Sequence, residues 1–230
     1  MFISEIYQSN QGEGQLTGTP SVFVRTSGCN LRCGFCDTPF ASWHPEGEKL
    51  SVAEVVDRTA QNAGGSQHVV VTGGEPMLPD EIGSLCEGLH AADFHITIET
   101  AGTIYRNLNC ELMSISPKLS NSTPESGRAG RWLEKHESQR HRPEIVSRLI
   151  VEYDYQLKFV VAQPNDLKEI NEYLDQIKNV DRARVLLMPE GIDTATLDSR
   201  TPWIKEVCDR EGFTFCQREH IFWYGNKRGT

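Results

Sequence analysis

Three cysteines stand close enough together in this sequence to share one metal centre. Cys29, Cys33 and Cys36 fall within eight residues of one another. Thiolates bind zinc and iron strongly, and three from one loop can hold a single centre. A structural zinc would need a fourth ligand, and His44 is near enough in sequence to complete a Cys3His site. Three thiolates are otherwise one too few for an ordinary four-cysteine [4Fe–4S] cluster, which leaves one iron open to a small molecule.

Polar segments that could bind a ligand follow several predicted strands. They are Thr72-Gly73-Gly74-Glu75-Pro76, Glu99-Thr100-Ala101-Gly102-Thr103, Ser116-Pro117-Lys118 and Met188-Pro189-Glu190-Gly191. Paired glycines let the backbone approach a ligand, and Glu75 can accept a hydrogen bond from an ammonium group. Ser116 and Lys118 suit a ribose or a carboxylate. Each segment alone could be an ordinary polar turn, but parallel strands would bring all of them to one rim.

The amino-terminal part of the chain adds groups suited to a small polar substrate. Gln11 and Glu13 alternate with glycines, and an amide and a carboxylate can bind an edge that carries a pair of donors. Arg25 can form a two-pronged contact with a carboxylate. The alternatives are a solvent-exposed turn at 11–14 and an outward-pointing surface charge at Arg25.

Alternating apolar runs and helical patterns must position these residues. Strands are predicted at 22–25, 68–72, 95–99, 112–116, 156–161, 184–188 and 213–217, with helices at about 52–63, 79–92, 166–178 and 202–211. Ser51 and Glu54 form a capping-box pattern, and Asn165 is the expected N-cap of the third helix. This alternation predicts an α/β fold with a mostly parallel sheet, open or curled into a partial or complete barrel.

One domain is expected to span residues 1–230. The stretch at about 119–148 interrupts the alternation and is predicted to be a loop leading into a peripheral helix. Its basic residues could contact a partner, although charge runs are usually solvated faces. Cys86, Cys110, Cys208 and Cys216 are expected to be small buried residues, and His68, His90 and His95 to be structural.

Composition limits the function classes. The chain has 230 residues, 38% of them hydrophobic and 24% charged, and it contains no run of 18 apolar residues, which excludes disordered, collagen-like and membrane-spanning proteins. Its 23 basic and 32 acidic residues give a net charge of −9, so general nucleic-acid binding is not expected. The start of the sequence lacks the pattern of a signal peptide, and a cytoplasmic location is expected.

The cysteine spacing, with an aromatic residue immediately before the last cysteine, resembles the radical S-adenosylmethionine (SAM) superfamily. The Gly73-Gly74-Glu75-Pro76 segment resembles its GGEP motif. Together with Gln11-Gly12-Glu13-Gly14, Cys36-Asp37-Thr38 and Ser116-Pro117-Lys118, these motifs resemble the 7-carboxy-7-deazaguanine synthase family across nearly the whole chain. The resemblance implies a reduced form of the superfamily's partial (β/α) barrel. It also implies conversion of 6-carboxy-5,6,7,8-tetrahydropterin to 7-carboxy-7-deazaguanine with loss of ammonia, on the route to queuosine.

The resemblance also implies a set of cofactors and residue roles. Cys29, Cys33 and Cys36 would hold a [4Fe–4S] cluster whose open iron binds SAM, and Thr38 would contribute to a Mg²⁺ site that forms only with substrate bound; alternatively, Thr38 caps a turn. The expected SAM-binding residues are Phe35, Asp37, Gly73, Gly74, Glu75, Ser116, Pro117, Lys118, Met188, Pro189, Glu190 and Gly191. The expected substrate-binding residues are Asn10, Gln11, Gly12, Glu13, Arg25, Thr72 and Thr230, and the expected catalytic residues are Glu13, Arg25 and Glu99.

The resemblance also implies partners, and two rival functions are considered beside it. A homodimer and an external electron donor such as flavodoxin are implied. His220 is a candidate for the family's substrate-proximal histidine, and the aromatic run Phe222-Trp223-Tyr224 is expected to anchor a tail that folds over the substrate. The rivals are an activase that makes a glycyl radical on a partner protein and a non-enzymatic zinc-binding module.

Overall fold

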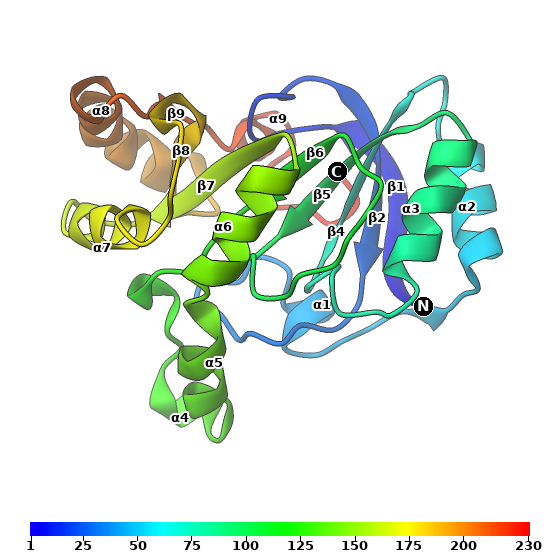
Figure 1. Ribbon diagram of the computed structural model, residues 1–230, viewed down its shortest axis with the longest axis horizontal. Helices are drawn as coiled ribbons and strands as arrows, with labels where there is room; N and C mark the ends of the chain where they lie inside the picture. Colours follow the sequence, from blue (N-terminus) through cyan, green and yellow to red (C-terminus); the bar gives the residue numbers. More distant parts are fainter.

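Nine β-strands pair in one open sheet in the computed structural model, which describes residues 1–230 (Figure 1). The spatial order is β3-β1-β2-β4-β5-β6-β7-β8-β9, so β3 and β9 are the two edge strands and the sheet does not close into a barrel. The strands are β1 (Phe2–Asn10), β2 (Pro20–Thr26), β3 (Glu48–Lys49), β4 (His68–Gly73), β5 (His95–Thr100), β6 (Leu112–Ile115), β7 (Tyr155–Val161), β8 (Val185–Pro189) and β9 (Thr214–Phe215).

Most of the longer helices cover the outer face of this curved sheet, and nine α-helices occur in all. They are α1 (Pro39–Ser42), α2 (Val52–Gln61), α3 (Ile82–Ala91), α4 (Ser126–Ala129), α5 (Trp132–Arg140), α6 (Pro143–Glu152), α7 (Asp166–Leu174), α8 (Thr194–Glu211) and α9 (Glu219–Tyr224). In Figure 1, α3 and α6 lie in front of the sheet, whereas α9 and the chain end lie behind it. The inner face is therefore free of long helices, and loops and the tail cover it.

The seven strands from β2 onward in the sheet are mutually parallel, as the alternating pattern predicts. The amino-terminal strand differs, because β1 runs antiparallel to both β2 and β3. The strand analysis missed β1, since an irregularity between Ile3 and Glu5 breaks its two-residue alternation. The sheet is therefore mostly parallel, as predicted, with β1 as the exception at its amino-terminal side.

The core lies between the sheet and its outer helices. A cluster of 37 buried hydrophobic residues joins the strands to α2, α3, α6, α7 and α8. The predicted capping box opens α2, with Ser51 and Glu54 bonding each other's backbone N–H groups. Asn165 precedes α7 but makes no side-chain cap; instead Asp166 accepts hydrogen bonds from the backbone of Ala162 and Gln163.

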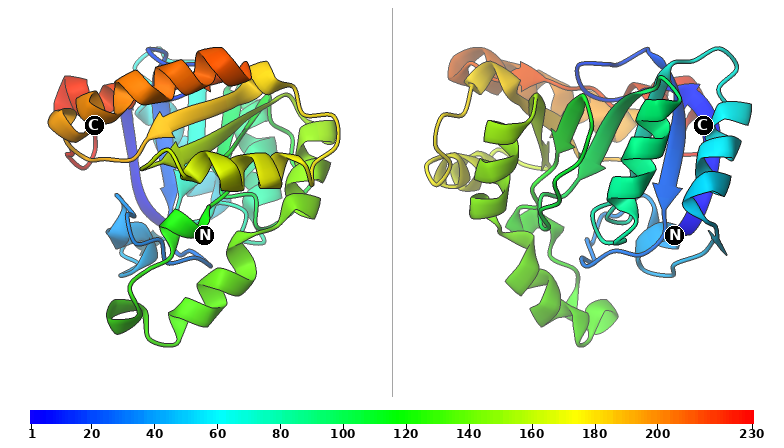
Figure 2. Two further views of the ribbon diagram at one scale, coloured as in Figure 1. Left: turned by 90° about the vertical axis from the view of Figure 1, so that its left-hand side faces the viewer. Right: turned by 45° about the vertical axis from the view of Figure 1, so that its right-hand side comes forward.

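Two predicted elements are corrected by the structure. The helix expected from residue 202 begins at Thr194, because Asp193 caps it and Pro202 lies inside the helix rather than at its start. The 119–148 stretch contains α4, α5 and the first turns of α6. Only α4 and α5 project from the body, whereas Val146, Leu149 and Ile150 of α6 are buried against the sheet (Figure 2).

No helix of the chain is both long enough and apolar enough to cross a bilayer.

Candidate functional site

A cavity of about 490 Å³ opens on the inner face of the sheet, where the carboxyl ends of the parallel strands meet. Most of the residues singled out from the sequence line it together. They are Asn10, Gln11, Gly12, Glu13, Arg25, Cys29, Cys33, Phe35, Cys36, Asp37, Thr38, Thr72, Gly73, Gly74, Glu99, Ser116, Lys118, Met188, Glu190, His220 and Thr230. Segments far apart in sequence thus form one site, as expected for the strand ends of a barrel-like fold.

The three cysteines line one end of this cavity in the loop after β2. Burial raises the pKa of Cys29 and raises that of Cys33 to about 12, so these thiols stay protonated without a cation beside them. Iron ions would supply that positive charge, and a set of three sulfur donors fits a cluster with one open iron. His44 is exposed and lies outside the cavity lining, so it does not complete a Cys3His cage.

The cysteine loop is supported by the inserted segment. His136 of α5 is fully buried and accepts a hydrogen bond from the backbone N–H of Arg32 at 3.1 Å, while Gly34 donates to the Ser122 carbonyl at 2.8 Å. The Arg32 guanidinium lies 3.7 Å from the Trp132 ring centroid. The insertion therefore buttresses the loop, a role the sequence analysis did not assign to it.

The turn after β4 packs directly against the cysteine loop. A Cβ on Gly74 would lie 2.0 Å from the Gly28 carbonyl oxygen, and Gly73 has a φ of +137°. Glu75 does not line the cavity: it is fully buried, and its carboxylate accepts hydrogen bonds from Met77 N–H, the Thr100 hydroxyl and Ala101 N–H. Glu75 thus fixes the ends of β4 and β5 relative to each other.

The ends of β6 and β8 contribute fewer of the expected residues. Lys118 Nζ donates to the Ser116 hydroxyl at 2.7 Å, and both residues face the cavity. Pro117, Pro189 and Gly191 do not line it, although the Gly191 carbonyl accepts a hydrogen bond from Arg218 at 2.6 Å. Glu190 lines the cavity while its carboxylate pairs with Arg200.

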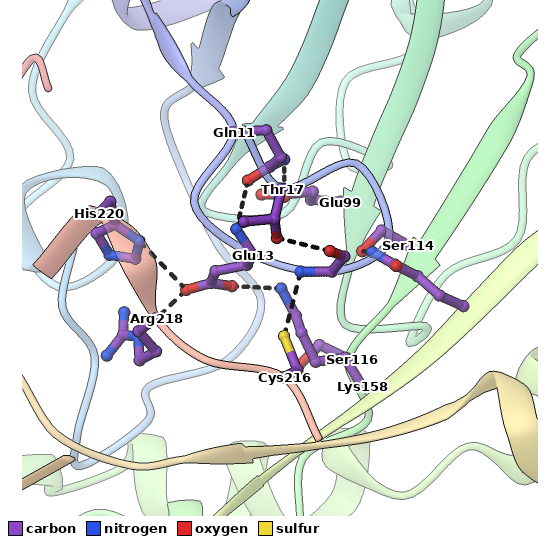
Figure 3. Close-up of polar contacts among 12 residues, drawn as sticks. Gln11, Glu13, Thr17, Glu99, Ser114, Ser116, Lys158, Cys216, Arg218 and His220 are labelled. Atoms are coloured by element: carbon purple, nitrogen blue, oxygen red, sulfur yellow. Dashed lines mark hydrogen bonds and ion pairs between the residues drawn. The ribbon is translucent and has the colours of Figure 1, made fainter. Parts of the chain in front are cut away.

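The loop at 11–14 is built into the inner face and is not a solvent-exposed turn (Figure 3). Gln11 is 4% exposed; its amide nitrogen donates to Glu99 at 3.0 Å, and its amide oxygen accepts from the Glu13 N–H at 3.0 Å. Gly14 N–H donates to the Cys216 sulfur at 3.1 Å, so Cys216 is a polar anchor as well as a buried residue. A Cβ on Gly12 would lie 2.6 Å from the His220 side chain.

Arg25 points into the cavity and not outward. Its Nε donates to Glu5 at 2.7 Å and its Nη2 to the Tyr7 hydroxyl at 2.9 Å. A guanidinium has five N–H donors, so three remain for a ligand. The arrangement fits capture of a carboxylate by Arg25, with Glu5 holding the guanidinium in place.

Two cations of the site were missed in the sequence. Lys158 of β7 and Arg218, just before α9, both pair with the Glu13 carboxylate (Figure 3). The pattern that could have indicated Lys158 is the alternation of Gln156 and Lys158 with Leu157 and Phe159 in a strand buried on both faces. Arg218 lies two residues before His220, and no local pattern in that segment indicates its role.

Thr38 lies in the cavity wall before α1 and makes no side-chain cap to that helix. Its hydroxyl has one weak contact, with the Cys36 sulfur at 3.9 Å. The Thr38 side chain therefore does not cap α1, and the residue is part of the cavity lining.

The carboxyl-terminal residues Asn226–Thr230 line the cavity mouth. Arg228 attaches the tail to β1, pairing with Glu5 at 2.9 Å and Glu46 at 3.0 Å and lying 4.0 Å from the Phe40 ring centroid. The expectation that the aromatic run anchors the tail is wrong for Phe222 and Trp223, which are 37% and 40% exposed. Ile221 is buried instead, and Tyr224 accepts a hydrogen bond from Asn10.

Known proteins resemble this chain both in sequence and in fold. A model of the radical SAM superfamily matches residues 23–118. The 7-carboxy-7-deazaguanine synthase of Rhodopirellula baltica is 45% identical over 231 residues, covering 100% of this chain and 89% of the relative. The chain belongs to the 7-carboxy-7-deazaguanine synthase family. The synthase of Halobacterium salinarum is 42% identical and covers 95% of this chain and 88% of its own length.

Solved structures agree with the family's fold. The crystal structure of QueE from Escherichia coli superposes with a TM-score of 0.70 at 24% identity, covering 95% of this chain and 94% of that one. Streptococcus suis SuiB bound to S-adenosylmethionine has a TM-score of 0.53 at 14% identity, covering 86% of this chain and 53% of its own. The predicted partial barrel of the radical SAM superfamily is thus confirmed. Membership in this superfamily implies a [4Fe–4S] cluster and SAM, so a closed zinc site is no longer favoured.

Proposed function

We propose that this chain converts 6-carboxy-5,6,7,8-tetrahydropterin to 7-carboxy-7-deazaguanine with loss of ammonia. The observation that carries the proposal is that Cys29, Cys33 and Cys36 line the same cavity as Gln11, Glu13 and Arg25. Kinship with the synthases of Rhodopirellula baltica and Halobacterium salinarum supports the same assignment. A cluster site and substrate-binding groups within one cavity are what a radical enzyme with a small substrate needs.

Different residues of the cavity are proposed to bind the cluster, SAM and the substrate. When bound, the cluster and SAM supply the one-electron chemistry that removes a hydrogen atom from the substrate. Cys29, Cys33 and Cys36 would hold the cluster. The residues that line the same cavity and would bind SAM are Phe35, Asp37, Gly73, Gly74, Ser116, Lys118, Met188 and Glu190. Arg25 would bind the substrate carboxylate, and Gln11 and Glu13 its donor-bearing pterin edge.

We also assign the Mg²⁺ to the neighbourhood of Thr38. The Thr38 hydroxyl makes no capping hydrogen bond to α1, which supports this assignment. Mg²⁺ commonly completes its coordination shell with waters and substrate oxygens. Glu99 is the proposed acid–base or orienting group, since it lies in the cavity and already accepts a hydrogen bond from Gln11.

Two partners are part of the proposal. An external electron donor such as flavodoxin would approach the cysteine loop, where exposed Arg128 and Lys135 stand beside it on α4 and α5. A homodimer is supported by the exposed rings of Phe222 and Trp223 on α9, which a second copy could cover.

An anaerobic assay tests the function. Purified, iron-reconstituted protein is incubated with the carboxy-tetrahydropterin, SAM, a reductant and Mg²⁺, and the deazaguanine product is followed by mass spectrometry. We expect product in the complete mixture and none without SAM.

Replacement of Cys29, Cys33 or Cys36 by Ala is expected to abolish SAM cleavage, because a second iron loses its ligand. A variant that keeps full cleavage would contradict the cluster assignment.

A further inference from the structure

The Glu13 carboxylate is held by cations from two directions (Figure 3). Lys158 Nζ donates to Glu13 Oε2, and Arg218 Nε donates to Glu13 Oε1 at 3.1 Å. His220 Nδ1 lies 3.9 Å from the same Oε1 atom. The side chains of Lys158 and Arg218 are only 6% and 7% exposed, so these pairs lie in the wall of the cavity and not on the surface.

We propose that Lys158 and Arg218 are positioning residues that fix the Glu13 carboxylate as a hydrogen-bond acceptor, and that they thereby select a substrate edge carrying two adjacent donors. This inference rests on the proposed function and deepens it. Neither residue is among the groups expected from the sequence to bind substrate.

The carboxylate has room for a ligand beside its two cations. A carboxylate can accept about four hydrogen bonds, and the structure shows one strong contact on each Glu13 oxygen. One acceptor position therefore remains on each oxygen. Two neighbouring N–H groups, such as those of an aminopyrimidinone ring, would match this pair.

Each cation is itself held in place. Arg218 also donates to Asp37 and to the Gly191 carbonyl, so it joins the cysteine loop and the end of β8 to Glu13. On β7, Gln156 accepts from the Gln15 N–H at 2.8 Å, which seats the 11–14 loop directly over Lys158. The strand thus presents Lys158 at a fixed point of the inner face.

The electrostatics agree with an acceptor-only role. Burial would raise the pKa of Glu13, but Lys158 and Arg218, with a smaller contribution from His220, outweigh it and hold the pKa far below its usual value. Glu13 and Glu99 likewise raise the pKa of Lys158 despite its burial. Glu13 is therefore ionised throughout the working pH range and cannot donate a proton.

The first test measures turnover of the carboxy-tetrahydropterin by Lys158→Met, Lys158→Arg and the matched surface control Lys168→Met, which alters an exposed lysine of α7. We expect Lys158→Met to raise KM on the order of 100-fold, because removing one partner of a buried charge pair leaves the other uncompensated. The KM of Lys158→Met should also rise further as the pH falls from 8 to 6. Without its lysine partner the buried Glu13 carboxylate is protonated more easily, and it then loses an acceptor position for the substrate. Lys158→Arg should recover most of the affinity, and Lys168→Met should match the parent. An unchanged KM in Lys158→Met, or equal damage in Lys158→Arg, would overturn the proposal.

The second test needs no substrate and so separates this inference from the proposed function. Urea unfolding of the ligand-free protein is compared for Glu13→Gln, Lys158→Met and the double variant. Loss of Lys158 should destabilise the parent strongly and the Glu13→Gln background much less, because the neutral amide needs no counter-charge. Additive effects would show that Lys158 does not act through Glu13. If Lys158→Met does not fold, the same cycle with Lys158→Gln, which is neutral but polar, decides the question. Absence of deazaguanine product from the parent, with this coupling intact, would refute only the function.

Discussion

Gly74 occupies a position where a single methyl group has no room. An alanine Cβ there would lie 2.0 Å from the backbone oxygen of Gly28, next to Cys29, so the cysteine loop would have to move. We expect Gly74→Ala to cost about 1–3 kcal/mol of stability and to abolish SAM cleavage. Gly83→Ala is the matched control, since nothing lies within 4 Å of the added Cβ on α3. Thermal unfolding and a deoxyadenosine assay measure the two effects; cleavage by Gly74→Ala at the level of the control would contradict the close packing.

The Thr38 hydroxyl is expected to matter to Mg²⁺ and not to the cluster. Thr38→Val keeps the shape of the side chain but removes the oxygen, and should weaken the stimulation of turnover by Mg²⁺ while leaving the iron content unchanged. Thr38→Ser keeps the oxygen and should respond like the parent. A magnesium titration of product formation decides; identical titrations for Val and the parent would remove Thr38 from the metal site.

At the scale of elements, the carboxyl-terminal tail at 226–230 is attached to the rest of the protein mainly through Arg228. Arg228 binds Glu5 of β1 and Glu46 and stacks on Phe40, while Glu5 also holds Arg25 inside the cavity. Because exposed ion pairs contribute little to folding, Arg228→Ala should change the unfolding free energy by about 1 kcal/mol or less.

The same substitution should have a larger effect on the reaction. A loosened tail admits water, so Arg228→Ala should raise KM for the pterin and increase the deoxyadenosine formed per product. A long carboxyl-terminal tag should act in the same direction. Arg148→Ala is the control, since Arg148 also pairs with a carboxylate and stacks on a ring, at Glu152 and Tyr105. Unchanged coupling in both Arg228→Ala and the tagged protein would make the tail an ordinary terminus.

The sequence predicted elements whose pattern is local and missed those that depend on distant partners. Strands such as β4 and β5 are continuous β-branched runs, and α2 carries its own capping box, so both were found. The polar strand β1 exists because β2 and β3 pair with it, and the support of the cysteine loop by His136 joins residues 104 positions apart. For the same reason the motif residues were identified, whereas Lys158 was not: its role depends on Glu13, 145 positions away.

At the scale of the whole molecule, an acidic chain concentrates its functional cations inside. The net charge is −9, yet Arg25, Lys118, Lys158 and Arg218 all line the cavity, each beside a polar or acidic group. These cations can bind an anionic group of a substrate inside the cavity, while the net negative charge of the chain repels polyanions. The carboxylates of Glu5, Glu13 and Asp37 compensate the charges of the cations that they pair with in the cavity.

The opposite end of the sheet holds a group that makes global stability depend on pH. His68 of β4 is 5% exposed, with Nδ1 2.6 Å from the Ser21 hydroxyl and Nε2 2.8 Å from the Thr97 hydroxyl, so it ties β2, β4 and β5 together. Burial, with a smaller effect of nearby His95, lowers the pKa of His68 to about 4. The unfolded chain, with a histidine pKa of about 6.5, therefore binds more protons than the native protein between these two values.

Stability should consequently fall as the pH drops below about 6.5, and the loss from His68 should be complete near pH 4, reaching up to about 3 kcal/mol. The paired carboxylates Glu13 and Asp37 add their own losses below about pH 4.5, because the unfolded chain protonates these groups there while ion pairing in the native protein keeps their pKa values lower. Urea unfolding at pH 7 and pH 5 measures the effect. His68→Gln should be less stable than the parent at pH 7 but should lose less stability on acidification, because an amide does not titrate. The control is His90→Gln on the surface of α3, for which the change of unfolding free energy with pH should match that of the parent. Equal slopes for His68→Gln and the parent would show that the acid sensitivity of the fold arises elsewhere.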